Sequence, residues 1–83
     1  MIIGIVKGSV WATKKDERLN GCKLMLVQTK RSLIVATDEV GAGTGDKVLL
    51  CYGSSAHISK DAPIDAAIVG IIDSLESEEL YEY

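Results

Sequence analysis

Five short aliphatic runs, separated by glycine-rich or charged segments, divide the 83-residue chain and limit what it can fold into. Short runs rich in Ile, Val and Leu, bounded by turn residues, are typical of β-strands. The sequence therefore predicts five strands, at 2–13, 22–29, 33–38, 47–52 and 67–74. So many short strands in so short a chain favour an all-β fold, a small five-stranded barrel of the OB type.

Two glycines, Gly4 and Gly8, interrupt the first predicted strand. Glycine inside a strand weakens it, and usually marks sharp coiling or a place where another backbone approaches closely. Alternation along this run also predicts that Val10 and Ala12 share the face of Val6.

The connections between the strands carry turn residues. The three-residue segment 30–32 between the second and third strands is typical of a hairpin. The segment 53–63 predicts turns and one short helical turn, with Asp61 as its cap and proline near its first position. We expect one barrel domain at 1–75, followed by an acidic tail or short helix at 76–83.

Apolar residues occupy both faces of three predicted strands, at 22–29, 47–52 and 67–74. They contribute to a hydrophobic content of 47%. A chain this short has a marginal core of its own. Small domains commonly compensate for a marginal core by burying a second apolar face between subunits, so we expect an oligomer.

The net charge of −3 argues against a nucleic-acid partner, because such partners usually require a clustered basic face. Cys22 and Cys51 share no ligand spacing and lie among apolar neighbours, which favours buried free thiols in a reducing cytosol. The sequence contains neither a signal-peptide pattern nor a stretch long enough for a membrane span. We therefore expect a soluble cytosolic protein with no membrane partner.

The stretch VGAGTGD at 40–46 superficially resembles a phosphate-binding loop. Dinucleotide binding requires the spacing G-x-G-x-x-G before a helix, whereas Gly41, Gly43 and Gly45 alternate and a predicted strand follows. The favoured interpretation is a connection whose backbone adopts positive φ or lies against another chain.

No other motif indicates an active site. His57 is the only histidine, and GSSAH at 53–57 lacks the G-x-S-x-G pattern of a nucleophile elbow. Acids such as Asp38 and Asp46 stand at predicted strand or turn edges, where carboxylates normally accept hydrogen bonds from local backbone amides. We expect no enzyme activity, no metal and no cofactor.

Three segments together resemble one family. They are GIVKGSVWATKK with LNGCKLMLVQ, then VATDEVGAGTGDKVLLCYGSSA, then APIDAAIVGIIDSL. The sequence resembles the EutN/CcmL family, the pentameric vertex proteins of bacterial microcompartment shells, including carboxysomes. The resemblance covers nearly the whole chain, up to about Leu75.

The resemblance implies an OB-like barrel that assembles as a cyclic pentamer and caps the vertices of a polyhedral shell of hexameric tiles in the bacterial cytoplasm. Three groups of residues become candidates for assembly roles. They are Gly41, Ala42, Gly43 and Gly45 at a subunit interface; Gly53, Ser54, Ser55 and Ala56 at the axial pore; and Lys14, Lys15, Arg18 and His57 at contacts with neighbouring tiles.

The chain departs from the family pattern at two places. Members commonly have an extended insertion between the second and third strands, where this chain has only KRS, and many have Arg where this chain has His57. The acidic tail is not a family signature. The alternative hypothesis is an OB-type module that binds a small ligand or nucleic acid, which would need stacking aromatic residues beside basic ones.

Overall fold

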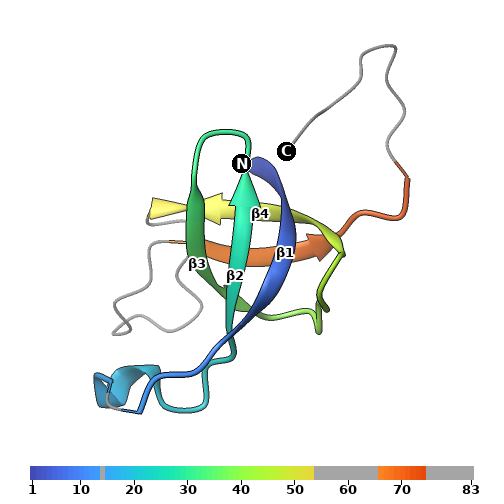
Figure 1. Ribbon diagram of the computed structural model, residues 1–83. Coiled ribbons are helices and arrows are strands. Elements are labelled where there is room, and N and C mark those ends of the chain that lie inside the picture. The colour runs from blue at the N-terminus through green and yellow to red at the C-terminus, as the bar shows by residue number, and fades with distance from the viewer. Residues whose placement is uncertain (14, 54–65, 75–83) are drawn as a thin grey trace.

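A computed structural model describes residues 1–13, 15–53 and 66–74. These residues form a closed barrel with the strand order β1-β2-β3-β5-β4 (Figure 1). The strands are β1 (Ile2–Val10), β2 (Leu24–Thr29), β3 (Leu33–Asp38), β4 (Lys47–Tyr52) and β5 (Ala66–Ile71). The predicted all-β class and five-stranded barrel are confirmed.

The third and fourth predicted strands are confirmed at both ends, whereas the other three have different limits. The first ends at Val10 and the second begins at Leu24, because these two residues form the last pair of the β1–β2 ladder. The fifth spans Ala66–Ile71 and is shorter than predicted.

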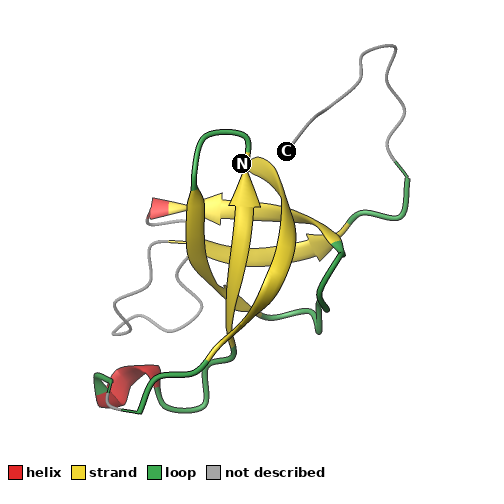
Figure 2. Ribbon diagram, in the orientation of Figure 1, coloured by secondary structure: helices red, strands yellow, loops and turns green. Residues whose placement is uncertain are grey.

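Helical conformation in the described ranges is of the 3-10 type: a turn, η1 (Glu17–Leu19), lies below the barrel, and Gly53 follows the end of β4 (Figure 2). The helical turn predicted within 53–63 falls almost wholly outside the described residues. Nowhere in 1–13, 15–53 and 66–74 is a helix long and apolar enough to cross a membrane.

A β-bulge just after Val6 changes which residues of β1 face the interior. Val6 is fully buried, but beyond the bulge Ser9 lies opposite the buried Met25 and donates a hydrogen bond to its sulfur at 3.7 Å. The prediction that Val10 and Ala12 share the face of Val6 was therefore wrong, because the extra residue reverses the alternation.

The interior is filled by aliphatic side chains from all five strands. The larger buried ones are Val6, Met25, Val27, Val48, Leu50 and Ile68. A second, smaller cluster includes Cys51 and Ala67, with Leu19 and Cys22 packed against it. Both cysteines are free thiols; the predicted burial is confirmed for Cys51, whereas Cys22 is only half-buried.

Gly4, like the next residue Ile5, pairs with two strands at once, and it lies opposite Thr29 of β2 and Val48 of β4. A Cβ atom built on Gly4 would lie 2.6 Å from Cγ1 of Val27 and 3.0 Å from the carbonyl oxygen of Gln28. The close backbone approach predicted for the first strand is confirmed at this glycine.

We expect Gly4→Ala to lower the free energy of unfolding by about 1–3 kcal/mol, because the added methyl overpacks a rigid interior. Urea denaturation at one fixed chain concentration measures the change. Gly8→Ala is the matched control in the same strand, since a Cβ there meets nothing within 4 Å. Equal losses in both variants would contradict the close-approach explanation.

Candidate functional site

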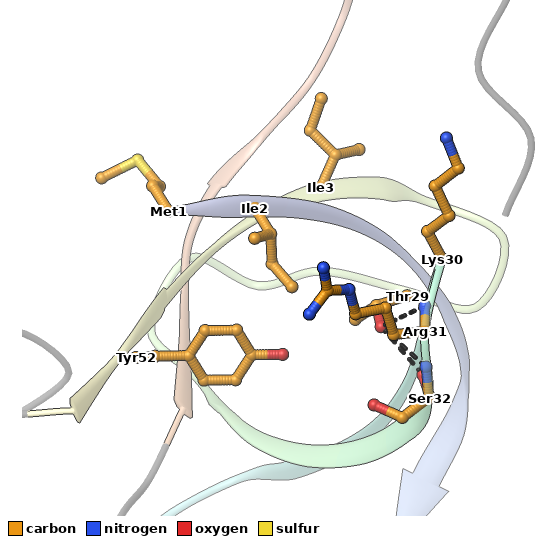
Figure 3. A pocket seen from close by; sticks show the side chains of 8 residues that line it. All are labelled: Met1, Ile2, Ile3, Thr29, Lys30, Arg31, Ser32 and Tyr52. Atoms are coloured by element: carbon orange, nitrogen blue, oxygen red, sulfur yellow. Dashed lines mark hydrogen bonds between the residues drawn. The ribbon is translucent and has the colours of Figure 1, made fainter.

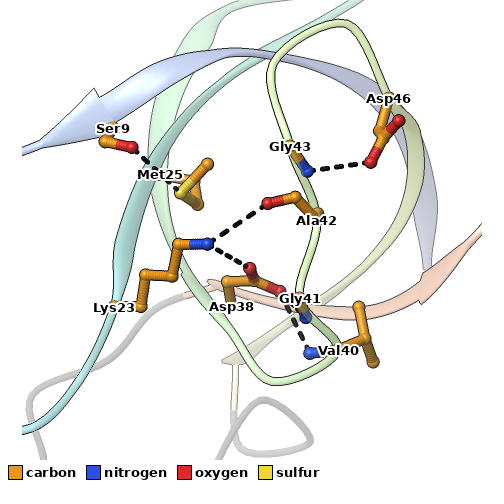
Figure 4. A network of polar contacts seen from close by, with 9 residues as sticks. All are labelled: Ser9, Lys23, Met25, Asp38, Val40, Gly41, Ala42, Gly43 and Asp46. Carbon is orange, nitrogen blue, oxygen red and sulfur yellow. Dashed lines mark hydrogen bonds and ion pairs between the residues drawn. The ribbon is translucent and has the colours of Figure 1, made fainter.

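Two aspartates hold the glycine loop between β3 and β4 (Figure 4). Oδ1 of Asp38 accepts hydrogen bonds from the backbone amides of Val40 and Gly41, each at 3.0 Å. Oδ2 of Asp46 accepts one from the amide of Gly43 at 2.8 Å. The prediction that these acids bond local backbone is confirmed.

The loop is also fixed to the barrel. The amide of Val6 donates to the carbonyl of Asp46 at 2.9 Å, and the amide of Gly45 donates to the carbonyl of Val6 at 2.8 Å. The ammonium of Lys23 lies 3.4 Å from the carbonyl oxygen of Ala42 and 3.5 Å from Oδ2 of Asp38, whose side chain is fully buried (Figure 4). The side chain of Ala42 itself belongs to the barrel core.

This geometry disfavours a phosphate cradle. A cradle needs several free backbone amides pointing at the anion. In the loop, five amides donate to partners within the chain, and two of the acceptors are carboxylates. Those five amides belong to Val40, Gly41, Gly43, Gly45 and Asp46.

The three glycines of the loop differ in what their positions require. Gly41 and Gly45 adopt φ of 81° and 93°, a region that L-residues rarely enter. Gly43 has no positive φ, and a Cβ built on it would meet only Oδ2 of Asp46, at 3.8 Å. The single chain therefore leaves Gly43 without an explanation.

The other predicted assembly residues are only partly described. Gly53 is exposed at the end of β4 with φ of 66°. The remaining pore candidates Ser54, Ser55 and Ala56, and the tile-contact candidates Lys14 and His57, lie outside the described residues. Within 1–13, 15–53 and 66–74, no group of His, Cys, Asp or Glu side chains could hold a metal ion.

The two described tile-contact candidates, Lys15 and Arg18, are both exposed beside the 3-10 turn. The guanidinium of Arg18 donates to both oxygens of Asp16, from Nε to Oδ1 at 2.9 Å and from Nη2 to Oδ2 at 2.7 Å. These side-chain hydrogen bonds lower the pKa of Asp16 to about 2, and the hydrogen bond from the Arg18 amide contributes a smaller part of the shift.

Sequence reasoning did not name the apolar residues on the outside of the barrel. Alternation along β3 places Leu33 and Val35 outward, 53% and 47% exposed, and Leu26 of β2 lies directly opposite Val35. We call these three residues the β3 patch. On β1 and β4, the outward pair Ile3 and Leu49 is half-buried, and we call it the β4 patch.

In the closed strand order, β2 and β3 lie across the barrel from β4. β5 separates β3 from β4 on one side of the barrel and β1 with β2 on the other, while Ile3 of the β4 patch lies on β1, the strand that pairs with β2. The sequence did indicate these patches, because apolar residues occupy both faces of the predicted strands. The alternation of side chains along a strand does not, however, say which face lies outside the barrel.

Comparison with known proteins identifies the family of this barrel. The family model described as ethanolamine utilisation protein EutN/carboxysome matches residues 1–73. The chain belongs to the EutN/CcmL family. It is 45% identical to a protein of Rhodospirillum rubrum named bacterial microcompartment shell vertex protein GrpN, with 93% of this chain and 98% of the relative covered. It is 36% identical to the carboxysome shell vertex protein CcmL of Nostoc, over 100% and 93% of the two chains.

Solved structures agree with the sequence matches. The chain superposes on Gloeobacter violaceus CcmL with a TM-score of 0.88 at 35% identity, over 94% of this chain and 91% of that one. It superposes on the GrpN pentameric microcompartment shell protein from Rhodospirillum rubrum with a TM-score of 0.81 at 41% identity, over 95% and 100%. Membership in this family favours a structural role over an enzymatic one.

We expect Asp46→Ala to lower the free energy of unfolding by about 1 kcal/mol, because the Gly43 amide loses its acceptor. Asp46→Asn is the matched control, since its amide oxygen still accepts the bond, and it should retain most of the stability. Urea denaturation of both variants at one chain concentration measures the difference. Equal stability of Asp46→Ala and the parent would contradict this role.

We expect Arg18→Ala to raise the pKa of Asp16 from about 2 towards its ordinary value of 3.8. The Asp16 contribution to stability is fully present above pH 3.8 and is lost as the pH falls through about 2, because the folded pKa is the depressed one. Titration of the Asp16 carboxyl carbon by NMR measures both values. Lys15→Ala is the control and should leave the pKa of Asp16 at about 2.

Proposed function

We propose that five copies of this chain form a ring that closes a vertex of a bacterial microcompartment shell. The observation that carries this proposal is the similarity, over nearly the whole of both chains, to GrpN, a pentameric microcompartment shell protein. We further propose that the ring contacts hexameric shell tiles and that the shell lies in the bacterial cytoplasm.

The outer surface of the barrel supports a ring. A ring with one kind of contact needs two different patches on each subunit, facing different directions, so that one subunit's first patch meets its neighbour's second. The β3 patch and the β4 patch are both apolar, and β3 and β4 themselves are not neighbours in the barrel. Their mutual burial would cover surface that a small barrel leaves exposed.

The glycine loop supports the same assembly. Gly41 and Gly45 are explained by positive φ, and Ala42 by the core, but Gly43 is explained by neither. A close approach by a second chain accounts for a glycine at this position. We therefore propose that this loop contacts the neighbouring subunit, with Gly43 at the point of approach.

The remaining assignments complete the proposal. Gly53, Ser54, Ser55 and Ala56 would line the axial opening, and Lys14, Lys15, Arg18 and His57 would face the tiles. Trp11, which is 91% exposed and lines a hollow with Lys15, adds an apolar anchor to that rim. Residues 1–75 would form the vertex domain, with 76–83 as a separate tail.

The alternative of an OB-type binding module is not favoured. Stacking of bases or ligands needs aromatic side chains together on one strand face. Trp11 follows the last residue of β1, whereas Tyr52 ends β4 at the opposite end of the barrel, beside the start of β1. The two aromatic residues therefore do not form a shared surface.

Native mass spectrometry should give an assembly of five times 8.9 kDa at micromolar chain concentration. Gly43→Val should abolish the ring and leave a folded barrel, because a branched side chain blocks the neighbour's approach but meets no backbone of its own chain. Thr44→Val, which makes the next position equally apolar without adding bulk, is the control for added hydrophobicity in the loop and should assemble fully.

The outcome has two parts. A parent chain that remains monomeric would contradict the ring itself. A Gly43→Val variant that assembles like the parent would contradict only the role of the loop. The vertex role is tested by co-expression with hexameric tiles, where closed polyhedral shells should form with the parent and incomplete shells with Gly43→Val.

A further inference from the structure

The end of the barrel where the chain starts is hollowed (Figure 3). The hollow has a volume of about 520 Å³ and lies between the start of β1, the end of β4 and the β2–β3 connection. Its apolar lining comes from Met1, Ile2, Ile3 and Tyr52. Its basic lining comes from Lys30 and Arg31.

The side chains of Ile2, Tyr52 and Arg31 point into this hollow, and the guanidinium of Arg31 faces the phenol of Tyr52 (Figure 3). The connection that carries Arg31 is held in place by the Thr29 hydroxyl, which accepts hydrogen bonds from the amides of Arg31 and Ser32 at 3.3 and 3.1 Å. Arg31 is thus presented from a fixed turn.

Neither Lys30 nor Arg31 is paired with a carboxylate of the part of the chain that the structure describes. An occupant that fits this hollow has to combine acidic groups for Arg31 and Lys30 with apolar or aromatic groups for Ile2 and Tyr52.

We propose that the hollow is the docking site of this chain's own C-terminal segment, residues 75–83. Its sequence, LESEELYEY, combines four glutamates with two leucines and two tyrosines, which is the chemistry that the hollow lacks. This segment lies beyond the residues 1–73 that the family model matches.

The reach of the segment is sufficient within one chain. β5 ends at Ile71 beside the start of β4, and the amide of Ile72 donates to the carbonyl of Lys47 at 2.8 Å. The hollow lies at the other end of β4, about 17 Å away for a strand of this length. Nine residues after Ser74 extend up to about 30 Å, which leaves several residues to occupy the hollow.

A protease that cleaves after glutamate tests the docking in the full-length protein. A docked segment resists such a protease, because cleavage requires an extended and accessible chain. Arg31→Glu should speed cleavage after Glu76, Glu78 and Glu79 at least tenfold, and 1 M salt should speed it in the parent, because salt screens the ion pairs.

The matched control is Lys15→Glu, which makes the same change in charge at the 3-10 turn, away from the hollow. Its rate of cleavage should lie within twofold of the rate for the parent. Arg31 uses its backbone amide, not its side chain, to stabilise the turn, so the variant keeps the fold, which circular dichroism checks. Equal cleavage of the parent and Arg31→Glu would overturn the proposal.

A cross-link identifies the occupant independently of assembly. Ser32→Cys combined with Tyr81→Cys should form a disulfide under mild oxidation, and the denatured, non-reduced product should run as a single chain. A ladder of linked chains would mean that the segment docks on a neighbouring copy, and no cross-link would mean that something else fills the hollow. Either result overturns the intrachain proposal and leaves the ring untouched.

Discussion

The approach of β1 to its two neighbours at Gly4 is the constraint on which the barrel depends. Five strands enclose little space, so the main core cluster holds only alanines, branched aliphatic side chains and one methionine. A Cβ at Gly4 would occupy the space of Val27 and touch the backbone of Gln28. The barrel therefore closes around a filled core, and whatever the protein does takes place on its outside and at its ends.

A filled core also explains why the outer surface carries so much apolar area. Leu33 and Val35 face outward from β3, while Ile3 and Leu49 do so from β1 and β4. In the proposed ring, the same strands supply two cores, one inside each barrel and one between neighbouring barrels. Stability and assembly are coupled in such a chain, since separated subunits would expose the second core.

Much of this could be predicted from local sequence. The strands at 33–38 and 47–52 are bounded by turn residues that act locally, and the roles of Asp38 and Asp46 follow from carboxylates next to glycines. The bulge after Val6 could not be predicted, because it depends on pairing with β2. The facing of Arg31 and Tyr52 depends on the barrel order, which brings the end of β4 beside the β2–β3 connection.

The barrel is not equally strong around its circumference. β3 and β5 are joined by only two residue pairs, Thr37 with Ala67 and Asp38 with Ile68, and they are the only parallel neighbours among the described strands. So few pairs make this the weakest seam of the barrel, whereas β1 and β4, which lie further apart in the chain, share four. With this seam open, the barrel becomes an open sheet with two unpaired edges, which are templates for aggregation. Any neighbour that contacts the outside of β3 in the closed form therefore protects the subunit at its most vulnerable place.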